Sequence, residues 1–148
     1  MAASASLWSA ADSQATLLNT GATLTSGSVA VSSAATPDNS TASTARRQFG
    51  MLELSVTYGT APAAGDYVTV YLVPAPDGTN YGDTTDPIAN TCIVANIPVR
   101  AVNTAQLIQA PIQLPGPFKF KTCLKNNAGQ TMNSGWTLKI NTFSNEQQ

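Results

Sequence analysis

The sequence contains no histidine, and only two of its 148 residues are cysteine. Histidine is the side chain that titrates near neutral pH without perturbation, so most acid–base catalysis and the usual zinc sites depend on it. Two cysteines are too few to hold a metal cluster by themselves. We therefore expect a non-enzymatic protein with no catalytic residue, no cofactor and no bound metal.

Charged residues are also scarce. They make up 10% of the chain, against roughly 25% in typical globular domains, and the net charge is −1. Alanine, serine, threonine and asparagine take their place, which gives a neutral, hydrogen-bonding surface suited to packing against copies of the same chain. Nucleic-acid binding needs clustered lysine and arginine, so we expect no nucleic-acid partner.

Long hydrophobic runs are absent from the sequence as well. No apolar run approaches the ~20 residues that span a bilayer. The N-terminal residues lack the basic region and the continuous apolar region of a secretory signal. We expect no membrane partner, and we expect the chain to be made in a cytoplasm.

The N-terminal third differs in composition from the remainder and is rich in alanine, serine and threonine. Short extended segments stand at 15–18 and 28–33, whereas residues 34–45 have almost nothing large to bury, which is typical of a mobile loop or linker. We predict that residues 1–47 form an extended N-terminal arm that contributes one or two strands, ahead of a main domain at 48–148.

From residue 48 onward the pattern is that of β-strands. In segment 48–58 apolar residues recur at every second position, the period of a half-buried strand, and in segment 66–76 both alternating sets are apolar enough to be covered. No segment shows a sustained helical period. Further strands are expected at 91–99, 105–114, 118–125 and 136–143.

This pattern predicts an all-β fold, an antiparallel two-sheet β-sandwich of six to eight strands. A jelly roll is the favoured topology, because eight strands in two sheets match both the strand count and the long crossover loops.

The carboxylates offer no clear catalytic set. Glu53 lies in the middle of a predicted strand, opposite the apolar set, where a solvated carboxylate is the ordinary case. The loop at 77–83 resembles a calcium loop superficially, but Thr79 and Tyr81 stand where the pattern needs acidic or amide ligands. We interpret this loop as a turn.

Carbohydrate binding is the more serious functional alternative. Tyr67 and Tyr71 share one strand face and Tyr81 follows in the loop, so they could offer an aromatic platform to a sugar. Tyrosines at this spacing are also ordinary packing residues. Trp136 shares a face with two aliphatic residues and is predicted to lie in the core.

The two cysteines leave two alternatives open. Cys123 alternates with the apolar residues of segment 118–125 and so faces the same side as the lysines there. Cys92 and Cys123 are either a disulfide or two free thiols, and a reducing cytoplasm favours the free thiols.

Four residues near the predicted arm are candidates for an interface. Leu7 and Trp8 are isolated apolar residues in a polar segment, and Trp8 either docks on a neighbouring molecule or covers the core of its own domain. Arg46 and Arg47 stand where the arm meets the sandwich, either as contacts to an acidic surface or as an exposed basic pair without a function.

Several segments of the second half resemble a known family. They are a strand and loop reading YLVPAPDGTNY, the turn LPGP, the strand and turn FKFKTCLKNNAGQ, and a closing strand SGWTLKINTFSNE. Together these segments, within residues 50–147, resemble small virion proteins encoded among the head and tail genes of tailed bacteriophages.

The resemblance implies a jelly-roll component of the virion, favoured as a capsid decoration or cement protein that stabilises the head by bridging capsomers. It also implies a homotrimer whose partners are the major capsid protein and copies of itself, with the arm reaching a neighbour. A tail or head-to-tail connector subunit is the first alternative. A glycan-binding β-sandwich module, with a host surface glycan as its partner, is the second.

Overall fold

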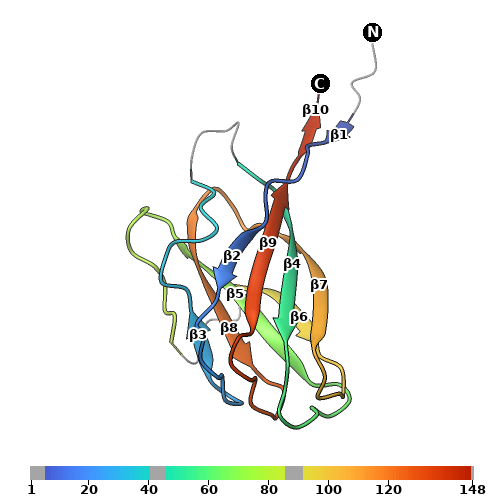
Figure 1. Ribbon diagram of the computed structural model, residues 1–148. Helices are drawn as coiled ribbons and strands as arrows, with labels where there is room; N and C mark the ends of the chain where they lie inside the picture. The colour runs from blue at the N-terminus through green and yellow to red at the C-terminus, as the bar shows by residue number, and fades with distance from the viewer. Residues whose placement is uncertain (1–5, 41–45, 86–91, 148) are drawn as a thin grey trace.

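The computed structural model describes residues 6–40, 46–85 and 92–147 (Figure 1). Its regular elements are β-strands, and within the described residues no helix is long and apolar enough to cross a membrane. The strands are β1 (Ser6–Trp8), β2 (Ala15–Leu18), β3 (Val29–Val31), β4 (Phe49–Val56), β5 (Tyr67–Ala75), β6 (Ile93–Pro98), β7 (Gln106–Gln113), β8 (Lys119–Asn126), β9 (Thr137–Phe143) and β10 (Asn145–Gln147).

Two antiparallel sheets of four strands form the body of the molecule, in the orders β2-β9-β4-β7 and β3-β8-β5-β6. The pairing is nested: β5 pairs with β6, β4 with β7, β3 with β8, β2 with β9, and β1 with β10. A chain that pairs in this way is one long hairpin wound into two sheets, which is the strand arrangement of a jelly roll. The predicted all-β, two-sheet antiparallel sandwich is confirmed.

The core lies between the sheets and is built by inward-facing side chains. In β4 every second residue is buried, including Leu52 and Leu54, so the period of two read from the sequence is confirmed. Trp136 is 2% exposed, and its indole Nε1 donates a hydrogen bond to the main-chain oxygen of Ala22 at 3.1 Å. The prediction that Trp136 belongs to the core is confirmed.

The N-terminal region supplies an edge strand to each sheet, because β2 pairs with β9 and β3 pairs with β8. The loop after β3, predicted to be a mobile loop or linker, is hydrogen-bonded to β8 along its described part. Thr122 Oγ1 in β8 donates to the main-chain oxygen of Thr36, and Phe120 N donates to that of Pro37. Residues 41–45 of this loop lie outside the described residues.

The outermost pair of the nested series, β1 and β10, forms a separate two-stranded ribbon. Figure 1 shows this ribbon projecting beyond one end of the sandwich. The same end carries the loop 36–40 and the approach to β4, so several of the residues singled out from the sequence gather there.

Candidate interaction surface

The two sheets differ in what lies on their outer faces. On the outer face of β3-β8-β5-β6, Tyr71, Val73 and Cys123 form a small buried cluster outside the main core. Tyr81, from the loop after β5, packs on this cluster, and the Lys121 ammonium lies 5.6 Å from the centre of the Tyr81 ring. The prediction that both faces of the 66–76 strand are covered is therefore confirmed.

The cysteines meet at this covered face as free thiols. Cys123 faces the lysine side of β8 as expected, but it is fully buried there. Burial raises the pKa of Cys123 to about 11, with the neighbouring Cys92 adding to the rise and Lys121 opposing it. Cys92 is half-buried and packs against the same cluster.

The tyrosine pair considered as a sugar platform is not a platform in the structure. Tyr71 is only 6% exposed because the loop covers it, whereas Tyr67 on the same strand face is 41% exposed. Tyr81 is half-buried against Tyr71 and its neighbours. A segment outside the strand, not the strand's own spacing, decides which tyrosine reaches solvent.

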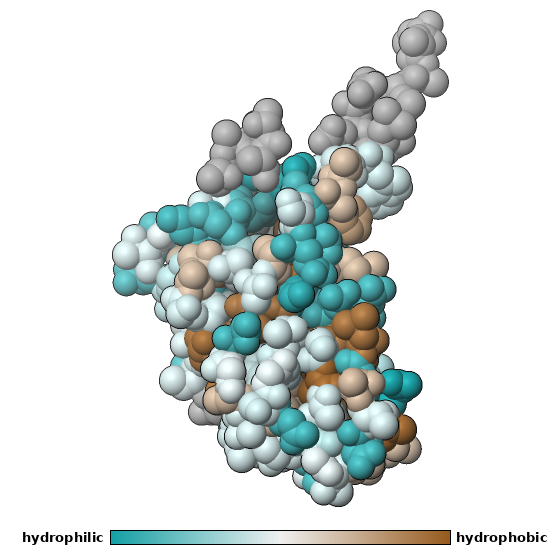
Figure 2. Space-filling view, viewed as in Figure 1, coloured by the Kyte–Doolittle hydropathy of each residue, from teal (hydrophilic) through white to brown (hydrophobic). Residues whose placement is uncertain are grey.

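The outer face of β2-β9-β4-β7 has no such cover among the described residues. Its central strands present half-exposed side chains from β4 and β9 that alternate with the core residues. Figure 2 looks onto this face, since β9, β4 and β7 are nearest the viewer in Figure 1, and shows hydrophobic side chains interspersed with neutral and hydrophilic ones. The outward residues of the two central strands are Phe49, Met51, Glu53, Ser55, Thr137, Lys139, Asn141 and Phe143.

An aromatic cluster lies at the end of this face where the ribbon leaves the sandwich. Phe49 and Phe143 are paired in register and stack with ring centroids 5.8 Å apart. Trp8 packs edge-on against both rings, at 5.5 Å and 5.6 Å, yet it remains 64% exposed. Trp8 therefore covers two aromatic residues on the outside of the sheet and not the core. Leu7 lies beside it in β1, with its main chain opposite Glu146 of β10.

Sequence reasoning missed Phe49 and Phe143 as partners of Trp8. The three residues lie in separate strands, and only the register of β4 with β9 and the position of the ribbon bring them together.

Arg47 forms an ion pair with an acid of its own chain. Its guanidinium donates to both carboxylate oxygens of Asp12, Nε to Oδ2 at 2.8 Å and Nη2 to Oδ1 at 2.6 Å. This hydrogen bonding holds the pKa of Asp12 below its usual value, partial burial opposes the effect, and a hydrogen bond from Thr142 adds to it. The pair ties the segment before β2 to the start of β4.

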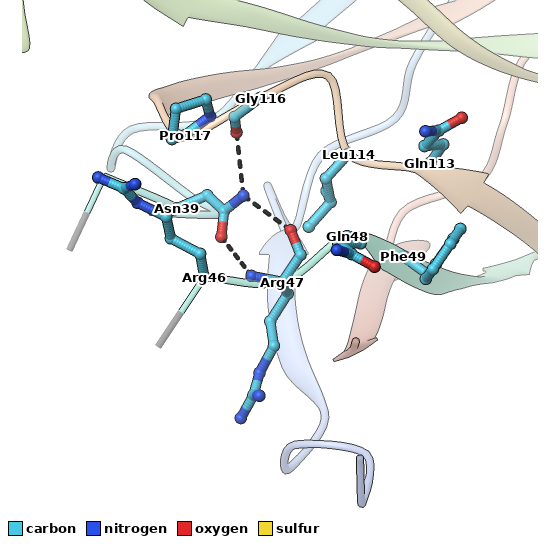
Figure 3. Close-up of a pocket in the computed structure, with 9 residues that line it drawn as sticks. All are labelled: Asn39, Arg46, Arg47, Gln48, Phe49, Gln113, Leu114, Gly116 and Pro117. Carbon is cyan, nitrogen blue, oxygen red and sulfur yellow. Dashed lines mark hydrogen bonds between the residues drawn. The ribbon is translucent and has the colours of Figure 1, made fainter. Parts of the chain in front are cut away.

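Arg46 lines a shallow hollow of about 550 Å³ at the same end of the sandwich (Figure 3). The hollow also carries polar and apolar groups from the approach to β4 and from the turn between β7 and β8. Its other lining residues are Asn39, Arg47, Gln48, Phe49, Gln113, Leu114, Gly116 and Pro117.

Asn39 organises this hollow, and sequence reasoning did not identify it. It is 5% exposed, and its Nδ2 donates to the main-chain oxygens of Arg47 and Gly116 at 2.8 and 2.9 Å, while its Oδ1 accepts from Arg47 N at 2.7 Å (Figure 3). A single side chain thus links the strand-ends of both sheets. Nothing in the composition of its polar segment distinguishes Asn39 from the other asparagines.

The carboxylates that could support chemistry are engaged in local hydrogen bonds. Asp77 Oδ1 accepts from the main-chain N–H groups of Thr79 and Asn80, which is the geometry of a turn. Glu53 accepts from Gln14 and Gln109 on the outer face of its sheet. Within the described residues, no three acidic or cysteine side chains gather in a way that could hold a metal ion.

Comparison with known proteins adds no relative: no protein-family model matches the chain, and a search of curated proteins finds no similar sequence.

Proposed function

We propose that this chain is a structural protein of a bacteriophage particle, and that it serves as a capsid decoration or cement protein. The observation that carries the proposal is the Trp8–Phe49–Phe143 cluster, which leaves a large aromatic side chain 64% exposed beside an uncovered sheet face. Exposed aromatic residues of this kind act as anchors in protein interfaces. The role assigned to this surface is contact within the particle, with copies of the chain and with the major capsid protein.

The neutral surface supports an assembly role. With only 10% of its residues charged, the chain can be covered by neighbours without the desolvation cost of burying unpaired ions. Many weak contacts on a symmetric shell then add through avidity. The sequence resemblance described above supplies the phage context.

The fold is compatible with this role but does not select it. Jelly rolls occur in viral capsid proteins and also in lectins, so the function depends on the surface features and not on the architecture. The aromatic platform that motivated the glycan-binding alternative is weakened by the burial of Tyr71. A tail or head-to-tail connector subunit would also contact its neighbours through exposed aromatic and neutral surfaces, and it is the alternative to test.

The test is to find the chain in particles. Particles purified by density gradient from the host that carries this gene are separated into heads and tails, and each fraction is analysed by peptide mass spectrometry. We expect the chain in the head fraction, with removal of the chain lowering the heat resistance of the heads. Recovery in tails alone would favour the connector alternative, and absence from both fractions would refute the proposal.

Incorporation can then be tied to the aromatic cluster. Trp8→Ala should reduce the number of copies per particle, whereas Tyr67→Ala, which removes an exposed aromatic residue on the opposite sheet, should not.

A further inference from the structure

We propose that the outer face of β2-β9-β4-β7 pairs with the same face of a second copy, about a two-fold axis that runs along the strands between β4 and β9. This proposal rests on the proposed function, since it assigns a partner to the surface that carries Trp8. Because it is tested on the isolated protein, its failure would leave the question of virion location open.

Of the two outer faces, this is the one that the described residues leave without a covering layer. The opposite outer face is covered by the loop that brings Tyr81 onto Tyr71 and Val73. On this face the described residues provide Trp8 at one end, and the side chain of Gln14 bonded to Glu53. The face carries the apolar side chains of Phe49, Met51 and Phe143 among polar ones, and covering these apolar side chains with another surface gains free energy.

The charges on the face identify a second copy as the partner. Glu53 and Lys139 are the charged residues among the outward positions of these four strands, and they are register partners in β4 and β9. Glu53 is bonded to Gln14 and Gln109, and Lys139 forms no ion pair with another described residue. A surface that carries one acid and one base side by side is complementary to itself when it is turned about a two-fold axis.

The direction of the axis follows from the same register. An axis along the strands places β4 of one copy over β9 of the other. Glu53 of each copy then faces Lys139 of the other copy, which gives two equivalent contacts. An axis across the strands would instead place Glu53 over Glu53 and Lys139 over Lys139. Opposite charges favour the first arrangement and disfavour the second.

The remaining rows agree with this axis. Phe49 and Phe143 are register partners, so this axis brings the aromatic clusters of the two copies to the same end, with the exposed Trp8 side chains between the two sheets. Ser55 and Thr137 form a polar row at the opposite end of the strands. Aligned packing of two sheets is a common arrangement in β-proteins.

The size of the face predicts a weak pair. Four strands about 4.8 Å apart and about seven residues long cover roughly 450 Å² in projection, below the ~800 Å² per partner of a standard interface. Trp8 adds to this area. We therefore expect association at high protein concentration, strengthened on a shell by the many copies held there. The two-fold pair differs from the trimer that the sequence resemblance implies.

The experiment is sedimentation equilibrium of the purified protein in 0.15 M salt, up to millimolar concentration. We expect a monomer–dimer equilibrium. Glu53→Lys and Lys139→Glu should each weaken dimerisation about tenfold or more. Each variant places like charges at both of the contacts between position 53 of one copy and position 139 of the other. An equimolar mixture of the two variants should dimerise again, since in the mixed pair each of these two contacts joins an acid with a base.

The mixture separates this proposal from effects within one chain. Each variant keeps its like charges within its own sheet after mixing, so recovery can come only from contact between copies. Circular dichroism melting checks that both variants are folded, and Thr137→Ser serves as a neutral control on the same face. A wild type that stays monomeric, a trimer, or dimers unaffected by both reversals would overturn the proposal.

Discussion

The two outer faces of this sandwich belong to sheets of equal strand number, yet they differ in how far other residues of the chain cover them. In β5 nearly every residue is buried, because the main core covers one side and the loop after the strand covers the other. In β4 buried and half-exposed residues alternate strictly. One sheet therefore carries a third layer made by its own chain, and the described residues provide no such layer on the other.

The covering loop is closely fitted to its sheet. Gly82 N donates to the main-chain oxygen of Pro74 at 3.3 Å, and a Cβ at Gly82 would lie 3.2 Å from Cγ1 of Val73. On the other sheet the corresponding apolar residues are left to solvent, with Trp8 spread over two of them. Among the described residues the chain covers one outer face and leaves the other open, and the open face is the one to which we assign contact with another molecule.

The largest effect should come from removing a covered aromatic residue. Tyr71→Ala should destabilise the protein by about 3 kcal/mol, because it leaves a cavity between the sheet and the loop. Tyr67→Ala is the matched control on the same strand and the same face, and because it is exposed it should cost less than about 1 kcal/mol. Both free energies are measured by urea unfolding. Equal costs for the two variants would show that the loop does not cover this face.

The second effect concerns the reactivity of the two thiols. A thiol whose pKa is about 11 is ionised to only about one part in a thousand at pH 8, and Cys123 is also shielded from solvent. In folded protein at pH 8, Cys123 in a Cys92→Ser variant should react with a disulfide reagent about 100-fold more slowly than Cys92 in a Cys123→Ser variant. The difference should vanish in urea. Rapid labelling of folded Cys123 would contradict the closed cluster.

A third, smaller effect tests how the two sheets are linked. Asn39→Ala removes the side chain that joins the approach to β4 with the turn before β8, and with it three hydrogen bonds to main-chain groups of Arg47 and Gly116. We expect a loss of about 2 kcal/mol in the free energy of unfolding. Asn19→Ala, at an exposed position, should change stability little. If the two variants unfold alike, the link is not needed.

The smallest effect should be the pH dependence contributed by Asp12, which is anchored to the sheet with the open face. Since the folded pKa of Asp12 is lowered, chiefly by its hydrogen bonds with Arg47, its stabilising contribution is present above the unfolded pKa of about 4 and is lost as pH falls through the folded pKa. The Asp12 side chain is 41% exposed, so we expect less than about 1 kcal/mol.

This contribution is measured as the difference between wild type and Asp12→Asn in urea unfolding from pH 7 to pH 3. Subtraction is needed because Asp38, Asp77 and Asp83 also have lowered pKa values. A difference that stays constant across this range would contradict the assignment.

Much of the fold could be predicted from the sequence, because strand positions depend on local periodicity. The alternation in 48–58 predicted β4, and the apolar character of both sides of 66–76 predicted that β5 is covered twice. The face shared by Trp136 with its aliphatic neighbours placed it in the core.

The surface features could not be predicted in the same way, because they depend on contacts between distant segments. Tyr67 and Tyr71 have the same strand spacing, and only the path of the later loop buries one of them. The position of Trp8 over Phe49 and Phe143 requires the register of β4 with β9, which local periodicity does not contain.

The central claim is that the open face makes the contacts within a particle while the covered face does not. Hydroxyl-radical labelling, read by mass spectrometry, compares purified particles with the dilute isolated protein at three oxidisable side chains. We predict that Trp8 and Met51 lose labelling in the particle, whereas Tyr67, exposed on the opposite sheet, is labelled equally in both states. Protection of Tyr67 with unchanged labelling of Trp8 and Met51 would contradict the account.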